Sequence, residues 1–143
     1  MEALAMLAFI HFTTANGPRL INVTEVVEVI PMVWLERDSD AIDNAYYIGL
    51  LNYRGNIISV FDPAGGAQQF VPQPDHFLIV CSNSVQTIAL IATEVHQLVD
   101  IDKDEIRQID ALNQASFSAA KLKDKIIRIV TTSDYIKRRD SNG

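Results

Sequence analysis

The sequence has one cysteine, Cys81, among its 143 residues. A single thiol cannot form an intramolecular disulfide and suits a reducing compartment, so the fold must be stabilised by its own core. A chain of this length buries about 68–70% of the surface that its unfolded form exposes, which is enough for such a core. The apolar N-terminal stretch, interrupted by Glu2 and His11, falls short of the ~20 residues that span a bilayer. We therefore expect a folded cytoplasmic protein without direct membrane insertion.

Positive charge is also scarce. The chain has 12 Lys and Arg and 18 Asp and Glu, which gives a net charge of -6. Nucleic-acid binding depends on Lys and Arg that neutralise phosphates, so we expect no nucleic-acid partner. The basic residues are concentrated late in the chain, where we interpret them as a solvated face rather than a site for an acidic partner: Lys121, Lys123, Lys125, Arg128, Lys137, Arg138 and Arg139.

Motifs for catalysis or metal binding are missing. The three histidines, His11, His76 and His96, are far apart in the sequence and have no further ligand at the spacing of a zinc site. His76 precedes Cys81 by five residues, about 17 Å along a strand, so the two side chains cannot form a nucleophilic pair. We interpret Cys81 as a small buried hydrophobic residue. The sequence thus predicts a protein that is not an enzyme and has no metal or cofactor.

Short apolar runs separated by turn residues are typical of a mainly β protein. We predict strands at 6–12, 19–22, 46–51, 57–61, 77–81, 87–92, 95–101 and 126–130, a helical turn leading into a strand within 23–30, and loops at 36–44 and 113–120. Thr131 to Asp134 offer N-cap side chains for a short C-terminal helix through Arg139. Trp34, Tyr46 and Tyr47 could line a binding groove, but they lie beside apolar runs and we interpret them as core residues.

The longest break in the pattern, at 62–75, contains three prolines and the Gly65-Gly66 pair. We therefore predict one domain, 1–143, built from two small β lobes that share a core. Lobe 1 covers approximately 13–70, and lobe 2 covers approximately 71–138 together with the N-terminal strand. Residues 140–143 are predicted to be a disordered tail.

One segment carries a family resemblance. It reads Gly49-Leu50-Leu51-Asn52-Tyr53-Arg54-Gly55-Asn56-Ile57-Ile58-Ser59-Val60-Phe61-Asp62 and resembles the signature of the CheW-like chemotaxis coupling proteins. The segments 21–29 and 89–95 also resemble that family, so the resemblance extends over about residues 5 to 138. It implies a fold of two SH3-like β-barrel lobes and a non-enzymatic adaptor that couples chemoreceptors to a CheA-type histidine kinase.

The resemblance and the local chemistry together indicate five site residues. Gly55 is expected at a tight turn with positive φ, which Asn52 caps with its side chain. Glu28 and Arg54 are predicted to form a bidentate salt bridge, whose disruption would cost ~3–5 kcal/mol if it were buried. The resemblance implies that Val26 and the turn lie near the receptor-contacting surface.

The implied partners are the regulatory domain of the kinase and the cytoplasmic tip of a methyl-accepting chemoreceptor, with weak self-association as a further expectation. Ser59, Pro63, Ala89 and Thr93 depart from the family pattern and suggest a divergent member that serves pili or surface motility. Two alternatives remain open: a scaffold or localisation factor that does not regulate the kinase, and a β-barrel that binds a small ligand.

Overall fold

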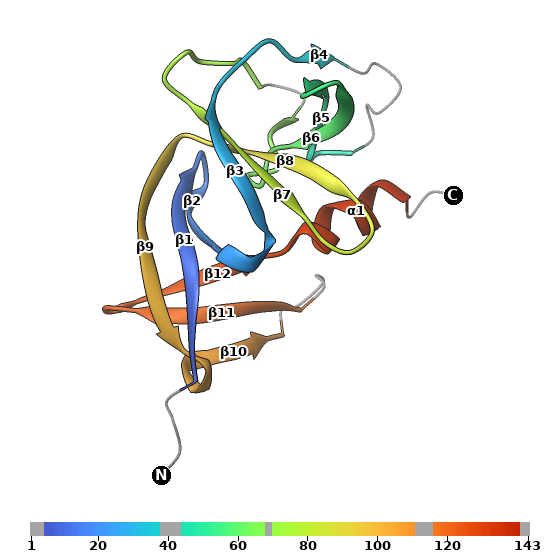
Figure 1. The fold of residues 1–143 in the computed structure, drawn as a ribbon. Helices are drawn as coiled ribbons and strands as arrows, with labels where there is room; N and C mark the ends of the chain where they lie inside the picture. The colour runs from blue at the N-terminus through green and yellow to red at the C-terminus, as the bar shows by residue number, and fades with distance from the viewer. Residues whose placement is uncertain (1–4, 38–43, 68–69, 111–115, 141–143) are drawn as a thin grey trace.

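The computed structural model describes residues 5–37, 44–67, 70–110 and 116–140, with side chains through residue 136. Twelve strands within these ranges form two six-stranded sheets, and one helix, α1 (Thr132–Asp140), follows the last strand (Figure 1). This confirms the predicted fold class, a mainly β protein with a short C-terminal helix. No helix in the described part of the chain is long and apolar enough to cross a membrane.

The first sheet combines the two ends of the chain in the order β10-β11-β12-β2-β1-β9. Its strands are β1 (Met6–Thr14), β2 (Gly17–Asn22), β9 (Glu94–Asp102), β10 (Ile106–Ile109), β11 (Phe117–Leu122) and β12 (Lys125–Val130). The second sheet comes from the middle of the chain in the order β3-β7-β8-β6-β5-β4. Its strands are β3 (Val26–Pro31), β4 (Glu36–Arg37), β5 (Tyr47–Tyr53), β6 (Asn56–Phe61), β7 (Phe77–Ser82) and β8 (Thr87–Ala92).

The two sheets divide the chain differently from the predicted lobes. The β7–β8 hairpin lies in the same sheet as β3 to β6, because β8 pairs in parallel with β6. The β1–β2 hairpin is joined to β9 to β12 in the same way, through the parallel pair of β2 and β12. The break at 62–75 thus connects two parts of one sheet. Parallel pairing joins strands that are distant in sequence and leaves no turn signal, so the sequence alone does not show which strands share a sheet.

Three apolar clusters stabilise this arrangement. One lies within the first sheet and contains Phe9 and Leu20, and another lies within the second sheet and contains Val60 and Leu78. The third joins the two sheets to α1 and is lined by Ile10, Phe12, Ile21, Tyr47, Phe61, Ile79, Cys81, Ile88, Leu90, Ala92, Val130 and Tyr135. A core shared between the two β units is therefore present, as predicted, and it includes Cys81, which is fully buried.

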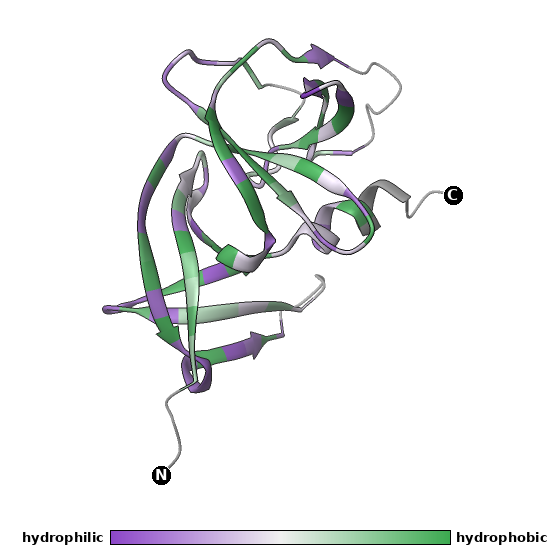
Figure 2. Ribbon diagram, viewed as in Figure 1, coloured by the Kyte–Doolittle hydropathy of each residue, from purple (hydrophilic) through white to green (hydrophobic). Residues whose placement is uncertain are grey.

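Hydropathy follows this layout. Figure 2 shows hydrophobic residues along β7 and β8, in the middle of the second sheet, and hydrophilic residues on its edge strand β4. Gly49 lies where β5 meets β4, and a Cβ atom built there would lie 2.1 Å from the backbone oxygen of Glu36. The first glycine of the signature segment therefore permits the close approach of these two strands.

Most local predictions are confirmed. Asn22 caps a 3-10 turn, η1 (Val23–Glu25), which leads directly into β3. At the start of α1, Thr131 N–H donates to Asp134 Oδ2 at 2.9 Å and Asp134 N–H donates to Thr131 Oγ1 at 3.2 Å. This reciprocal capping explains why the helix begins where the N-cap chemistry predicted.

Four predictions are wrong or fall outside the described residues. The predicted loop at 113–120 contains the start of β11, where Ala119 and Ala120 are buried between β10 and β12. The loop predicted at 36–44 contains the two-residue strand β4, and residues 38–43 lie outside the described ranges. Trp34 is 89% exposed and not a core residue, whereas Tyr47 is buried. Of the predicted tail 140–143, residue 140 ends α1 and residues 141–143 are not described.

Candidate functional site

The turn between β5 and β6 presents the central residues of the signature segment. Tyr53 pairs with Asn56, so only Arg54 and Gly55 form the turn. Their φ angles are 51° and 85°, and positive φ at both positions matches the right-handed twist of the flanking strands. Asn52 Oδ1 accepts a hydrogen bond from the N–H of Gly55 at 3.1 Å. The expected turn, cap and glycine conformation are therefore all present.

Glu28 comes from β3, at the opposite edge of the same sheet from β4. A bulge between Val26 and Glu28 leaves Val27 as an extra residue and places Glu28 opposite Val80 of β7. Strands β7, β8 and β6 separate β3 from β5 in the sheet order. Glu28 nevertheless contacts the β5–β6 turn through its side chain, so the sheet curls enough for side chains of its first and fifth strands to reach each other.

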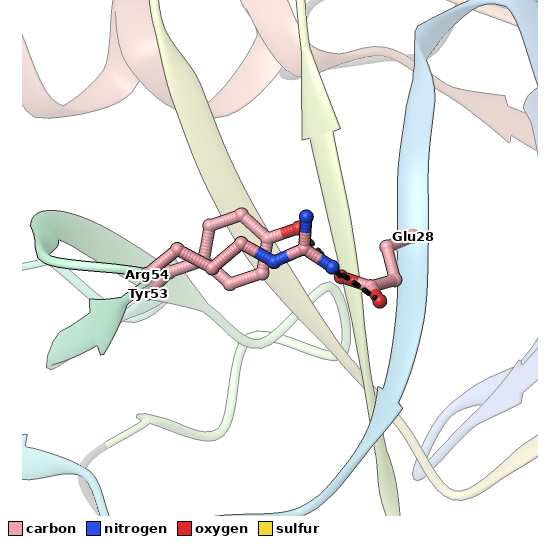
Figure 3. A network of polar contacts seen from close by, with 3 residues as sticks. All are labelled: Glu28, Tyr53 and Arg54. Atoms are coloured by element: carbon pink, nitrogen blue, oxygen red, sulfur yellow. Dashed lines mark hydrogen bonds and ion pairs between the residues drawn. The ribbon is translucent and has the colours of Figure 1, made fainter.

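Three side chains form the contact between β3 and the β5–β6 turn (Figure 3). Arg54 Nη2 donates to both carboxylate oxygens of Glu28, at 2.8 Å to Oε1 and 2.9 Å to Oε2. The hydroxyl of Tyr53 donates to the same Oε1 at 2.6 Å. The guanidinium carbon of Arg54 also lies 5.3 Å from the centre of the Tyr53 ring, within cation–π range. We call these residues the Glu28–Tyr53–Arg54 contact.

The predicted salt bridge between Glu28 and Arg54 is present, but its setting differs from the expectation. A single nitrogen of Arg54 makes both contacts, so the planar fork of the guanidinium is not used as a two-nitrogen clamp. The side chains are 69% exposed for Arg54 and 33% exposed for Glu28. The cost of ~3–5 kcal/mol that applies to a buried pair therefore does not apply to this one.

Tyr53 is the member of the contact that sequence reasoning missed. Its hydrogen bond to Glu28 favours the neutral phenol and raises the pKa of Tyr53, and burial adds to this effect. The phenol therefore remains a donor to the carboxylate at neutral pH. The sequence shows that Tyr53 is next to Arg54. It does not show that the Tyr53 side chain reaches Glu28, because β3 and β5 are not neighbours in the sheet.

Val26 occupies a different environment from the other four predicted site residues. Its side chain is half-buried and packs against the core cluster shared by the two sheets. The adjacent bulge residue, Val27, is 53% exposed. Ile57, on β6 just after the turn, is 63% exposed. Val27 on β3 and Ile57 on β6 therefore provide exposed apolar surface on strands next to the contact.

A second feature lies at the edge of the first sheet. His11 on β1 and His96 on β9 have ring centres 4.8 Å apart, and both line a groove of about 790 Å³ together with Lys123. Burial, His96 and Lys123 lower the pKa of His11, in that order of importance. The described residues contain no group of three or more His, Cys, Asp or Glu that could hold a metal ion. Sequence spacing gave no sign of this histidine pair, which depends on the long-range pairing of β1 with β9.

Comparison with known proteins gives two results on fold and relatives. The scaffolding protein TtCheW from Thermoanaerobacter tengcongensis has a similar crystal structure, with a TM-score of 0.71 and 24% sequence identity over 87% of this chain and 88% of that one. At this identity the likeness concerns the fold. No functionally curated protein matches the chain.

The match to a sequence family is more extensive. The family model described as the CheW-like domain covers residues 8–139, which begin within β1 and end within α1. This range includes both sheets and the whole Glu28–Tyr53–Arg54 contact. The chain therefore belongs to the family of CheW-like domains.

Proposed function

We propose that this protein is a non-enzymatic adaptor that couples the cytoplasmic tip of a methyl-accepting chemoreceptor to the regulatory domain of a CheA-type histidine kinase. Membership of the CheW-like family supports this role. The observation that carries it is the ordered but exposed Glu28–Tyr53–Arg54 contact on the signature turn. The protein would act on the cytoplasmic side of membrane receptor arrays.

The chemistry of the contact suits binding of another protein. Glu28 and Tyr53 hold Arg54 in place, yet within the described residues its Nη1 and Nε make no hydrogen bond. A held side chain loses little entropy when it binds, and its free N–H groups can donate to carbonyl or carboxylate oxygens of a partner. Val27 and Ile57 add exposed apolar surface on the neighbouring strands. A helical receptor tip with an apolar stripe and acceptor groups fits this combination.

A separate surface is proposed for the kinase. Trp34 lies just before the edge strand β4 and is 89% exposed. Exposed tryptophans are over-represented among residues that dominate binding energy, and a short edge strand leaves backbone groups free for docking. We assign this end of the second sheet to the regulatory domain of the kinase. Weak self-association through the same edge is part of this proposal.

The alternative is a scaffold or localisation factor that binds the array without regulating the kinase. One observation favours keeping it, since the similar structure TtCheW is described as a scaffolding protein. Both functions predict binding to array components, and they differ only in whether kinase activity changes. The departures at Ser59, Pro63, Ala89 and Thr93 support an output through pili or surface motility in either case.

Calorimetric binding to the cognate kinase regulatory domain and to a receptor tip fragment tests the proposed surfaces. The variants are Arg54→Ala and Trp34→Ala, with Arg107→Ala as a control that removes an exposed arginine from β10, in the other sheet. We expect Arg54→Ala to weaken receptor binding about tenfold or more, which corresponds to at least ~1.4 kcal/mol. Trp34→Ala should weaken kinase binding, and the control should behave as wild type. Absence of binding to both partners by the folded wild-type protein would contradict the proposal.

A further inference from the structure

A second polar site lies where the two sheets and α1 meet. A pocket of about 190 Å³ is lined by Asn16, Arg19, Tyr46, Arg128, Asp134 and Tyr135, and by the turn at 63–64. These residues come from the β1–β2 turn, from β2 and β12, from both ends of the β5–β6 hairpin and from the first turn of α1. None of them belongs to the Glu28–Tyr53–Arg54 contact, so the pocket is a separate feature of the molecule.

The two arginines are placed side by side by the parallel pairing of β2 and β12. Arg19 is the direct partner of Arg128 in this pair. Two residues further along each strand, Ile21 and Val130 are buried in the core shared by the sheets. Side chains two residues apart lie on the same face of a strand, so both arginines point toward the junction of the sheets. The two guanidinium groups therefore lie next to the shared apolar core, on the same face of their strands as Ile21 and Val130.

Neither guanidinium is neutralised by an ion pair. In the part of the chain that the structure describes, no carboxylate oxygen lies within 4.0 Å of Arg19 or Arg128. Arg19 Nη1 donates to the backbone oxygen of Pro18 at 2.8 Å, and Arg128 lies 4.3 Å from the centre of the Phe117 ring. Like charges opposite each other on neighbouring strands are destabilising. Burial lowers the pKa of Arg19 most, and the positive charge of Arg128 lowers it further.

Two carboxylates near the pocket accept hydrogen bonds from backbone groups. Asp134 lines it, but its Oδ2 accepts the hydrogen bond from Thr131 that caps α1. Asp62 is 6% exposed and its Oδ1 accepts from the N–H of Ala64 at 3.0 Å. Burial raises the pKa of the Asp62 carboxyl, and the charge of Arg19 is among the smaller effects that lower it. Among the described residues, the two guanidinium groups therefore have no carboxylate as an ion-pair partner.

We propose that this pocket binds a small oxyanion of the phosphate or carboxylate class between Arg19 and Arg128. Adjacent guanidinium groups match the geometry of such anions, because each can donate two parallel hydrogen bonds to a pair of oxygens. The side-chain amide of Asn16 is committed to the backbone oxygen of Ala64, so it positions the turn at 63–64 as a wall of the pocket. A bound anion would relieve the repulsion between the arginines and brace the junction of the two sheets with α1. This inference does not depend on the proposed adaptor function.

Titration of the full-length protein with inorganic phosphate, and separately with succinate, tests the site at constant ionic strength. Calorimetry gives the affinity, and amide NMR shifts of Asn16 and Ala64 locate the bound anion at the pocket. Arg128→Gln removes one guanidinium, and Arg19→Lys keeps the charge but removes the fork. Arg107→Gln removes the same charge from the exposed face of β10 and serves as the matched control.

We expect one-site binding of at least one of the two anions to the wild type and to the Arg107→Gln control. Binding should weaken about tenfold or more in Arg128→Gln and in Arg19→Lys, since each loses charge-assisted hydrogen bonds. The anion that binds more tightly identifies the ligand class. Unsaturable binding, or equal weakening in Arg128→Gln and in the Arg107→Gln control, would show a diffuse charge effect and overturn the proposal. Failure of both anions to shift the amides of Asn16 and Ala64 would overturn it as well.

Discussion

The Glu28–Arg54 pair is predicted to contribute little to folding stability although its geometry is close. The two groups are 2.8 Å apart, but 69% of the Arg54 side chain and 33% of the Glu28 side chain are exposed. Water screens such a pair, and fixing two long side chains costs entropy, so exposed pairs contribute ~0.2–1 kcal/mol in double-mutant cycles. Contact with both carboxylate oxygens places this pair in the upper part of that range. We predict a coupling free energy of about 0.5–1 kcal/mol.

A cycle of Glu28→Gln, Arg54→Ala and the double variant measures this coupling by urea unfolding followed by circular dichroism. Glutamine keeps an acceptor for the hydroxyl of Tyr53. Alanine keeps a Cβ atom at the positive φ of position 54, so the backbone cost of that conformation is common to all four proteins. The unfolding midpoint should shift while the denaturant slope stays constant. A coupling above ~3 kcal/mol would contradict this prediction, because it would show that the pair behaves as a buried one.

Three further outcomes follow from the buried residues. Burial raises the pKa of Asp62 above its usual 3.8. The folded state therefore retains that proton more strongly than the unfolded state, and stability falls as pH rises from 3.8 through the raised pKa. Asp62→Asn should remove this dependence in pH-resolved thermal melts and raise the melting temperature at neutral pH. Burial also raises the pKa of Cys81 to about 12, so a thiol reagent should label the native protein only as fast as it unfolds, and rapid labelling without urea would contradict this. Phe61 is 1% exposed and packs against Tyr47 and Tyr135 in the shared core. Phe61→Ala should therefore lower the free energy of unfolding by ~3–5 kcal/mol in urea titrations. A loss below ~1 kcal/mol would argue against the shared core.

Sequence reasoning succeeded where the signal is local. The turn at Arg54 and Gly55, its cap by Asn52, and the capped start of α1 all depend on residues within four positions of each other. The β7–β8 hairpin was read from two apolar runs on either side of a polar turn. Local chemistry of this kind determines turn type and helix start before any tertiary contact forms.

The sequence could not predict which distant strands meet. The division between the sheets depends on two parallel pairs, β2 with β12 and β6 with β8, and no turn links such strands. β11 was missed because its small residues resemble a loop, although Ala119 is buried opposite Arg128. The hydroxyl of Tyr53 reaches Glu28 only because the sheet curls. Site residues that depend on curvature or on parallel register therefore become visible only in the structure.

Reconstitution of kinase autophosphorylation with the cognate receptor and kinase tests the coupling role most directly. We expect this protein to raise receptor-dependent autophosphorylation, and we expect Arg54→Ala to remove the increase while the variant still binds the kinase through the Trp34 surface. Arg107→Ala should stimulate as the wild type does. If both partners bind the wild-type protein and kinase activity does not change, the coupling role is contradicted and the scaffold role takes its place.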